Sequence, residues 1–266
     1  MLYNIGREEL LYFIIPLISR KASKDWNMVS ELFNRTLWSC YNQTDPNFRI
    51  IVACHDIPEL TQKYDSRVEF IRVTENEAPI PKTQEEKMMD KGYKTHILAM
   101  RLRELGGGYA MMVDGDDLVS CHLAEFVNKN PNQNGFYVKT GYVYFVGDNY
   151  MKIMPKFSSG SACIVNYSVE DLPSDSTGAR TSNNDKNPWI IRKRHGGIVP
   201  FCEQTGRPLK PLPFKGAVYV LGSGENHSMY GKTTKYQTRK REFIEMFARK
   251  YPIKEKLKKE FSINWI

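Results

Sequence analysis

The sequence has no long hydrophobic run and no pair of closely spaced cysteines. Its longest apolar stretch, residues 10–18, is nine residues long and contains a proline, whereas a membrane-spanning helix needs about 20 residues. The first residues do not match a secretory signal, because Arg7 is followed at once by Glu8 and Glu9. The five cysteines lie far apart, which argues against a disulfide framework and against a zinc site. We therefore expect a cytoplasmic protein with reduced cysteines.

The composition favours a folded domain. Of the 266 residues, 41% are apolar and 12% are aromatic, which is enough for a core and excludes a disordered or collagen-like chain. The formal net charge is +8, and residues 232–260 hold most of it, with 11 Lys or Arg and four Glu. The remaining chain is nearly neutral, and its cations are not interleaved with base-stacking aromatic side chains. We therefore expect no nucleic-acid partner.

The last part of the chain, residues 232–266, is predicted to be a basic amphipathic helical tail. Apolar side chains recur there at helical spacing, first at Phe243 and Phe247 and later at Leu257 and Phe261. Such a helix either packs on the domain with a solvated basic face or makes a peripheral contact with the anionic inner face of a membrane. Both interpretations remain open.

The order of apolar segments predicts an α/β fold, with a Rossmann-type, mostly parallel central sheet flanked by helices. In the first half, strands are expected at residues 11–19, 48–54, 68–73 and 109–113. Helices are expected there at residues 23–40 and 83–105, and Ser23 is the expected N-cap of the first helix. In the second half, strands are expected at residues 136–146, 160–167 and 216–221, and helices at residues 118–127 and 189–194. The polar residues 171–188 predict a loop over a site or a mobile lid.

The strongest chemical signal is the quartet Asp114-Gly115-Asp116-Asp117, which follows a predicted buried strand. In open α/β sheets this edge of the sheet is where ligands bind. Carboxylates that are so close in sequence repel one another, so a bound cation would stabilise them. Mg²⁺ and Mn²⁺ are the cations that bind carboxylate oxygens of this kind. An ordinary acidic turn that caps the next helix is the structural alternative.

The strand order, the helix with Asp90, Lys91 and Lys94, and the stretch from Tyr109 to Asp117 together resemble the nucleotide-sugar-dependent glycosyltransferases of the GT-A fold, in particular family-2-like members with an Asp-x-Asp motif. The resemblance covers residues 11 to about 125 well and is looser up to residue 231. It implies one domain over residues 1–231, with a nucleotide-binding half at about 11–125 and an acceptor half at about 126–231, before the tail.

The resemblance also implies roles for individual residues. The metal, Mn²⁺ or Mg²⁺, would be held by Asp116 and by His227 near the end of the fold, and Asp117 would be a further ligand. Asp114 would contact the ribose or a metal-bound water. The residues implied in nucleotide-sugar binding are Pro16, Ser19, Arg20, Asp56, Lys91, Lys94, Asp114 and Gly115. His227 as a surface histidine and Lys91 as a solvated lysine are the alternatives.

The implied reaction is metal-dependent transfer of a sugar from a nucleoside diphosphate sugar, with a UDP-sugar favoured, to a hydroxyl of a glycan or lipid-linked acceptor. An inverting enzyme needs a carboxylate base, for which Asp185 is the first choice and Asp171 the second. A retaining enzyme needs no such base. His195, after three cations, is expected either to contact phosphate or acceptor hydroxyls or to lie at a basic helix end.

Other functions remain as alternatives. A sugar nucleotidyltransferase would carry a glycine-rich loop after the first strand, which residues 16–20 do not match. An Asp-nucleophile phosphatase would have Thr or Val two residues after its second aspartate, where Leu118 stands. A non-catalytic carbohydrate or membrane-surface binding module is not excluded by these residues.

Overall fold

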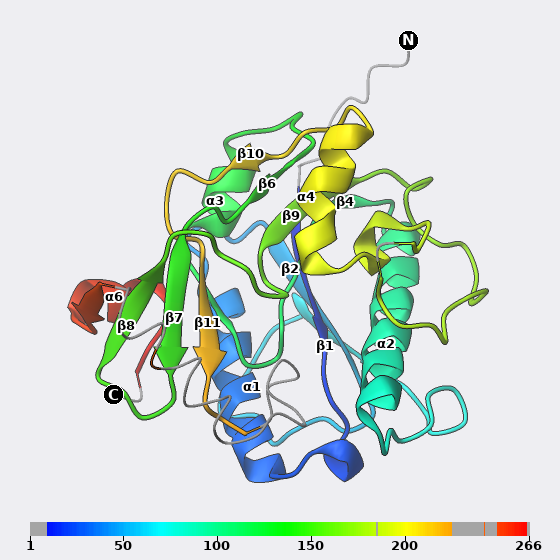
Figure 1. Cartoon of the computed structure of the whole chain (residues 1–266), viewed down its shortest axis with the longest axis horizontal. Helices are drawn as coiled ribbons and strands as arrows, with labels where there is room; N and C mark the ends of the chain where they lie inside the picture. The colour runs from blue at the N-terminus through cyan, green and yellow to red at the C-terminus, as the bar shows by residue number, and fades with distance from the viewer. Residues whose placement is uncertain (1–9, 185, 225–241, 243–248, 265–266) are drawn as a thin grey trace.

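The computed structural model describes residues 10–184, 186–224, 242 and 249–264, which form a mixed α/β fold with two sheets (Figure 1). The larger sheet has seven strands in the order β10-β6-β9-β4-β1-β2-β3. Their bounds are β1 Leu11–Pro16, β2 Phe48–Cys54, β3 Val68–Arg72, β4 Gly108–Met112, β6 Gly135–Tyr137, β9 Cys163–Tyr167 and β10 Lys210–Pro211.

The smaller sheet has five strands in the order β12-β8-β7-β11-β5. Their bounds are β5 Leu118–Val119, β7 Gly141–Phe145, β8 Tyr150–Met154, β11 Ala217–Leu221 and β12 Lys250–Pro252. Most pairings in this sheet are antiparallel, and only β7 and β11 pair in parallel. In the view of Figure 1, β1 lies between α2 (Gln84–Glu104) and the strands β7, β8 and β11.

The core of the larger sheet is parallel, as predicted. Leu11 in β1 lies beside Phe48 of β2 on one side and Tyr109 of β4 on the other. Every residue of β1 is buried, which explains why its sequence is continuously apolar. Because β1, β2 and β4 run the same way, their C-terminal ends meet at one edge of the sheet. Beyond β4 the sheet turns antiparallel, since β9 pairs antiparallel with both β4 and β6.

The two long helices are fixed at their starts by capping side chains. Helix α1 (Trp26–Tyr41) is capped by Asp25, whose carboxylate accepts hydrogen bonds from the N–H groups of Asn27 and Met28 at 3.0 and 3.1 Å. The prediction that Ser23 caps this helix was wrong, because a single 3₁₀ turn, η1 (Arg20–Ala22), precedes it. Helix α2 begins with a capping box of Thr83 and Glu86.

The segment after the acidic quartet differs from the prediction. Residues 118–127 are not one helix: β5 pairs with β11 in the smaller sheet, and α3 (Leu123–Asn128) starts only afterwards. Residues 136–146 are likewise divided between β6 in the larger sheet and β7 in the smaller one. The chain therefore passes between the two sheets at both places, which apolar periodicity within one segment does not reveal.

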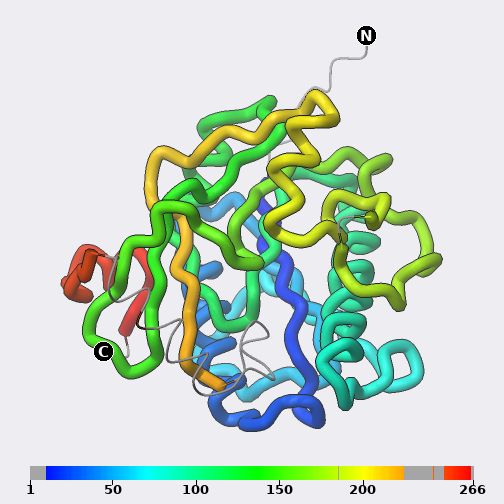
Figure 2. The backbone as a smooth tube through the Cα atoms, in the orientation of Figure 1, coloured from blue at the N-terminus to red at the C-terminus, as the bar shows by residue number. Residues whose placement is uncertain are grey.

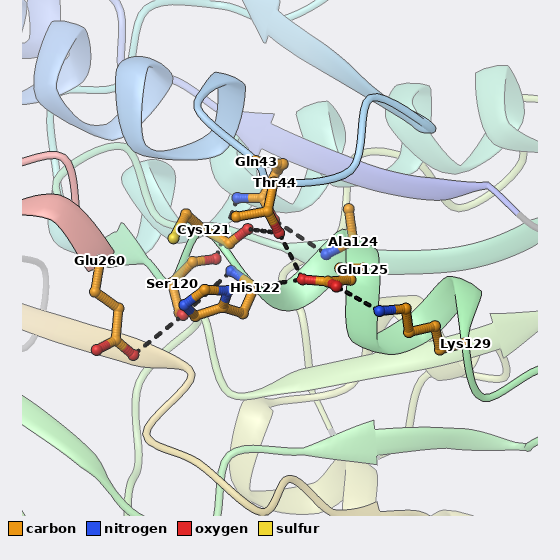
Figure 3. Close-up of polar contacts among 9 residues, drawn as sticks. All are labelled: Gln43, Thr44, Ser120, Cys121, His122, Ala124, Glu125, Lys129 and Glu260. Atoms are coloured by element: carbon orange, nitrogen blue, oxygen red, sulfur yellow. Dashed lines mark hydrogen bonds and ion pairs between the residues drawn. The ribbon is translucent and has the colours of Figure 1, made fainter.

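Polar contacts around the start of α3 explain why the helix is displaced (Figure 3). Gln43 accepts a hydrogen bond from the Ala124 N–H at 3.0 Å and donates one to the Ser120 carbonyl at 3.1 Å. Thr44 donates its hydroxyl proton to Glu125 at 2.9 Å. The loop after α1 thus supplies hydrogen-bond partners for backbone and side-chain groups of residues 120–125. In a continuous helix, the backbone groups would instead pair with residues four positions away in the same helix.

The described part of the C-terminal tail packs on the domain. Residues 250–252 form β12 instead of the predicted helix, with Tyr251 beside Met151 of β8, and the short helix α6 (Glu255–Glu260) follows. Phe261 is fully buried, with its ring centroid 5.7 Å from that of Tyr142. The outer side of this segment remains basic, because Lys254, Lys256 and Lys259 are exposed. Among the described residues, no helix has the length and apolar character needed to cross a membrane.

Candidate functional site

The acidic quartet forms the turn that carries the chain from β4 in the larger sheet to β5 in the smaller one. The Asp117 N–H donates to the Asp114 carbonyl at 3.0 Å and closes this turn. Just before it, the Val113 N–H donates to Ile14 in β1 at 2.9 Å, so the turn lies at the C-terminal edge of the parallel strands. The predicted position of the quartet at this edge is confirmed.

Asp117 faces the protein interior. It is fully buried, and its carboxylate accepts hydrogen bonds from the Ser161 hydroxyl at 2.8 Å and from the Val220 N–H at 3.1 Å. Burial raises the pKa of Asp117 well above its ordinary value, and the charges of Asp116 and Asp114 add to this shift. Asp117 thus joins the turn to β11, which argues against its predicted role as a further metal ligand.

Asp114 is held by Lys91 of α2, whose ammonium group lies 2.5 Å from the carboxylate. The Asp114 N–H donates to the Ser161 hydroxyl at 3.0 Å. A Cβ atom on Gly160 would lie only 2.3 Å from the Asp114 carboxylate, so glycine is required for this close approach. Burial alone would lower the pKa of Lys91, but the nearby Asp114, Asp116 and Asp117 raise it overall. Lys91 is therefore a cation inside the site and not a solvated lysine.

A cavity of about 700 Å³ lies over this turn. It brings together six of the predicted residues, namely Pro16, Lys91, Lys94, Asp114, Gly115 and Asp116. Three others lie near the same edge but do not line the cavity: Ser19 is fully buried, and the exposed Arg20 donates its backbone N–H to Asp56 at 2.8 Å. The cavity is also lined by His195, for which a contact with phosphate or acceptor hydroxyls was one of two expectations, and by residues that had no predicted role, among them Asn183 and Lys193.

Lys94 reaches the cavity wall as one half of a buried ion pair. Its ammonium group donates to Asp90, one helical turn earlier, at 2.7 Å. Burial lowers the pKa of Lys94, and the charge of Asp90 opposes this shift. His55 lies behind the pair: its Nε2 donates to the Ala78 carbonyl at 2.7 Å, and its Nδ1 lies 4.0 Å from the other oxygen of Asp90. Lys94 thus holds one oxygen of Asp90 in place at the cavity, and the 4.0 Å separation from His55 is too long for a hydrogen bond.

His195 is the first residue of α4 (His195–Gln204) and is exposed in the wall of the cavity. The expected basic helix end is present as a single 3₁₀ turn: η2 (Ile190–Arg192) ends with Arg192, Lys193 and Arg194 follow it, and a separate helix, α4, begins at His195. Desolvation by the cavity walls lowers the pKa of His195, and the charge of Asp114 opposes this shift. A neutral imidazole with an exposed edge is able to accept a proton.

The polar segment 171–188 runs beside α2 (Figure 2) and is fastened there by Arg192. The fully buried guanidinium group donates to Asn183 at 2.7 Å, to the carbonyl of Thr181 at 2.5 Å and to His96 of α2 at 2.7 Å. Asn183 in turn lines the cavity. The predicted loop is confirmed, and it reaches the cavity through Asn183; its buried hydrogen bonds argue against a freely mobile lid.

Of the two predicted carboxylate bases, Asp171 is described by the structure, and it is not brought to the site. Tyr167 at the end of β9 lies beside Gly108 at the start of β4, so the chain leaves β9 toward Asp171 at the edge of the sheet opposite to Asp114. There Asp171 pairs with Arg207 at 2.7 Å, so its predicted catalytic role is not supported. Asp185 lies outside the described residues, as does the predicted metal ligand His227.

The donor set suits a hard divalent cation that keeps much of its water. Asp116 is partly exposed at the cavity, and Asp114 stands beside it with Lys91 on one oxygen. The described residues contain no cluster of three His, Cys, Asp or Glu side chains that would enclose a metal. Mg²⁺ and Mn²⁺ commonly take one or two protein carboxylates and complete their shell with water and phosphate oxygens. Asp116 and Asp114 therefore fit such an ion together with a phosphorylated ligand.

Comparison with known proteins leaves the family open. No protein-family model matches the chain, and no curated protein is significantly similar to it. The function is therefore inferred from the geometry of the cavity and its side chains.

Proposed function

We propose that this protein is a metal-dependent glycosyltransferase of the GT-A type. It would transfer a sugar from a nucleoside diphosphate sugar, with a UDP-sugar favoured, to a hydroxyl of a glycan or a lipid-linked acceptor. The observation that carries this proposal is the pairing of Asp114 with Lys91 beside Asp116, at the C-terminal edge of parallel strands and in a cavity of about 700 Å³. The cavity therefore contains carboxylates that suit a divalent ion next to a cation that suits a phosphate group.

The departing nucleoside diphosphate gains negative charge, and the site offers positive charge to balance it. Mn²⁺ or Mg²⁺, held by Asp116 and Asp114, supplies Lewis-acid stabilisation when bound. Lys91 adds a fixed cation, because its three aspartate neighbours favour its protonated form. Arg194 contributes a further cation at the same cavity. Pro16 and Leu17 form the wall at the end of β1, where the nucleoside would lie.

The attacking hydroxyl must lose its proton, and His195 is positioned to take it. In an inverting transfer, the acceptor oxygen bonds to the anomeric carbon while the bond from that carbon to the phosphate oxygen breaks. The electron pair leaves with the nucleotide, and the hydroxyl proton passes to the neutral imidazole of His195. This role replaces the one predicted for Asp171, which lies at the far edge of the sheet.

The proposed place of action is the cytoplasm. The exposed lysines of the tail, Lys254, Lys256 and Lys259, give it a basic outer surface. Such a surface favours a peripheral contact with anionic lipid, where a lipid-linked acceptor would be presented.

Nucleotide release from UDP-, GDP-, dTDP- and CMP-sugars tests this function. Each donor is incubated with the protein and Mn²⁺, with and without a mixture of saccharide acceptors. We expect one donor class to be cleaved, with at least a hundredfold loss of rate in Asp116→Asn and none in Glu203→Gln, which changes an exposed carboxylate on α4 outside the cavity.

Two outcomes would contradict the proposal. Cleavage of no donor by the folded protein favours a non-catalytic binding module. Release of inorganic phosphate from a phosphate monoester, lost in Asp114→Asn, favours the Asp-nucleophile phosphatase.

A further inference from the structure

A second cavity of about 290 Å³ adjoins the first one, and the two share Ser158 and His195 in their walls. It lies between the segment after β6, the segment after β8 and the start of α4. A group bound in this cavity would meet a group bound in the first one beside His195.

The second cavity has a buried apolar floor made of Val138, Phe157, Ala162 and Cys163. Backbone hydrogen bonds hold this floor together. The Val138 N–H donates to Ala162 at 2.8 Å, and the Phe157 N–H donates to Lys139 at 3.2 Å. The floor is thus part of the sheet framework, and it offers an aromatic and aliphatic surface of the kind on which the apolar face of a sugar ring packs.

The charge of the second cavity is opposite to that of the acidic turn. Lys139 and Lys156 are both exposed at its rim, and none of its lining residues is Asp or Glu. The first cavity differs in that it is lined by charges of both signs, since Asp90, Asp114 and Asp116 lie there together with several Lys and Arg side chains. A concave surface with cations alone raises the local concentration of anions.

We infer that the second cavity is the acceptor subsite and that it selects a sugar carrying an acidic group, such as a phosphate ester or a carboxylate. The assignment of this cavity to the acceptor rests on the proposed function, because only a transferase binds an acceptor. The sugar ring lies on the apolar floor, its acidic group lies at Lys139 and Lys156, and the hydroxyl to be glycosylated faces His195. Ligand pockets usually measure about 300–1,000 Å³, so a cavity of about 290 Å³ suits a single sugar residue, with any further glycan or lipid in solvent.

The test measures dissociation constants by ligand-observed NMR, with the protein saturated by whichever nucleoside diphosphate binds it. The probes are glucose, glucose 6-phosphate, glucuronate and inorganic phosphate. The variants are the double charge reversal Lys139→Glu with Lys156→Glu and the matched control Lys63→Glu, which reverses an exposed lysine outside both cavities.

We expect at least one acidic sugar to bind about tenfold more tightly than glucose and than inorganic phosphate. The double reversal should remove this preference without changing the affinity for the nucleotide, and Lys63→Glu should keep it. Equal binding of glucose and both acidic sugars overturns the inference, as does a preference that survives the double reversal. Inorganic phosphate binding as tightly as the acidic sugars also overturns it, because a simple anion site would explain the lysines.

Failure of the proposed function has a different signature. If no nucleoside diphosphate binds, but an acidic sugar still binds in a way that depends on Lys139 and Lys156, the second cavity is a sugar site and the glycosyltransferase proposal falls.

Discussion

Asp114, Asp116 and Asp117 lie within four positions of the chain, yet their carboxyl groups have three different environments. Asp117 is buried against Ser161 and β11, Asp114 pairs with Lys91, and Asp116 is partly exposed at the cavity. The same short motif therefore supplies a structural anchor, a charge partner and a candidate metal ligand. Burial and hydrogen bonding decide which carboxyl group has which role.

Removal of the Lys91 cation tests its place in the site. In Lys91→Met, Asp114 loses its partner and a bound diphosphate loses a neighbouring positive charge, so we expect nucleoside diphosphate affinity to fall about tenfold or more. Isothermal titration calorimetry measures this change. Lys129→Met is the matched control, because it breaks an exposed pair with Glu125 away from the cavity and should leave the affinity unchanged. Equal affinities in both variants would show that Lys91 does not act on the ligand.

Residues of the site that belong to a recognisable motif were predictable, whereas the partner that a distant turn supplies to that motif was not. Asp114 and Asp116 share one motif, and Lys91 belongs to the helix just before it. Ser161, which bonds to both Asp114 and Asp117, comes from a segment more than 40 residues later. A sequence rich in serine and glycine at residues 158–161 indicates a turn, but only the packing of β9 against β4 places that turn on the carboxylates.

At the level of elements, Arg192 and His96 join the loop 171–188 to α2. His96 donates its Nε2 proton to the Asp175 carbonyl at 2.7 Å, so its Nδ1 is the acceptor for Arg192. Protonation of Nδ1 would remove that hydrogen bond and place a second cation against the guanidinium group. Burial lowers the pKa of His96, with the Arg192 charge acting in the same direction and Asp175 opposing it.

This geometry predicts a stability that depends on pH. Because His96 has a lower pKa in the folded chain than its unfolded value of 6.5, its contribution is present above pH 6.5 and is lost as the pH falls through the folded pKa. Urea unfolding at several pH values should show this loss, with a slope of at most about 1.4 kcal/mol per pH unit from this one group.

In His96→Gln, which keeps a donor and an acceptor but cannot titrate, that component of the slope should disappear. His122→Gln changes a largely exposed histidine and should retain it. An unchanged slope in His96→Gln would show that the Arg192 contact does not respond to protonation.

Long elements were easier to predict than short ones for a physical reason. Strands β1 and β2 and helix α2 have apolar patterns that continue over enough residues to fix their type. The two-residue β5 and the three-residue β12 owe their conformation to partners far along the chain, β11 and β8. Local helical spacing therefore dominated the predictions at residues 118–127 and 250–252, and tertiary pairing overrode it.

On the scale of the whole molecule, the acidic turn lies where the two sheets meet, and the C-terminal segment completes the second sheet. Strand β12 is its edge strand, and Phe261 and Leu257 pack in the same apolar cluster as Tyr142 of β7. The Cys121 N–H also donates to the Glu260 carbonyl at 2.8 Å, close to the site turn. The described tail is therefore part of the framework that supports the site.

Truncation of Phe261 tests this structural role of the tail. Phe261→Ala leaves a cavity in a fully buried position and should lower the free energy of unfolding by about 3–5 kcal/mol in urea denaturation. Lys259→Ala, at an exposed position of the same helix, should change it by no more than about 0.5 kcal/mol. A loss below about 1 kcal/mol in Phe261→Ala would mean that the tail is not integral to the fold.

The measurement that tests the central claim most directly is nucleotide affinity with and without metal. The dissociation constants of UDP, GDP, dTDP and CMP would be measured in Mn²⁺ and in chelator, for the wild-type protein, Asp116→Asn and the control Glu203→Gln. We predict that one nucleotide binds, that chelation weakens its binding at least tenfold, and that Asp116→Asn alone removes this metal dependence. Absence of nucleotide binding by the folded protein, or binding that is independent of both metal and Asp116, would contradict the assignment of this cavity as a nucleotide-sugar site.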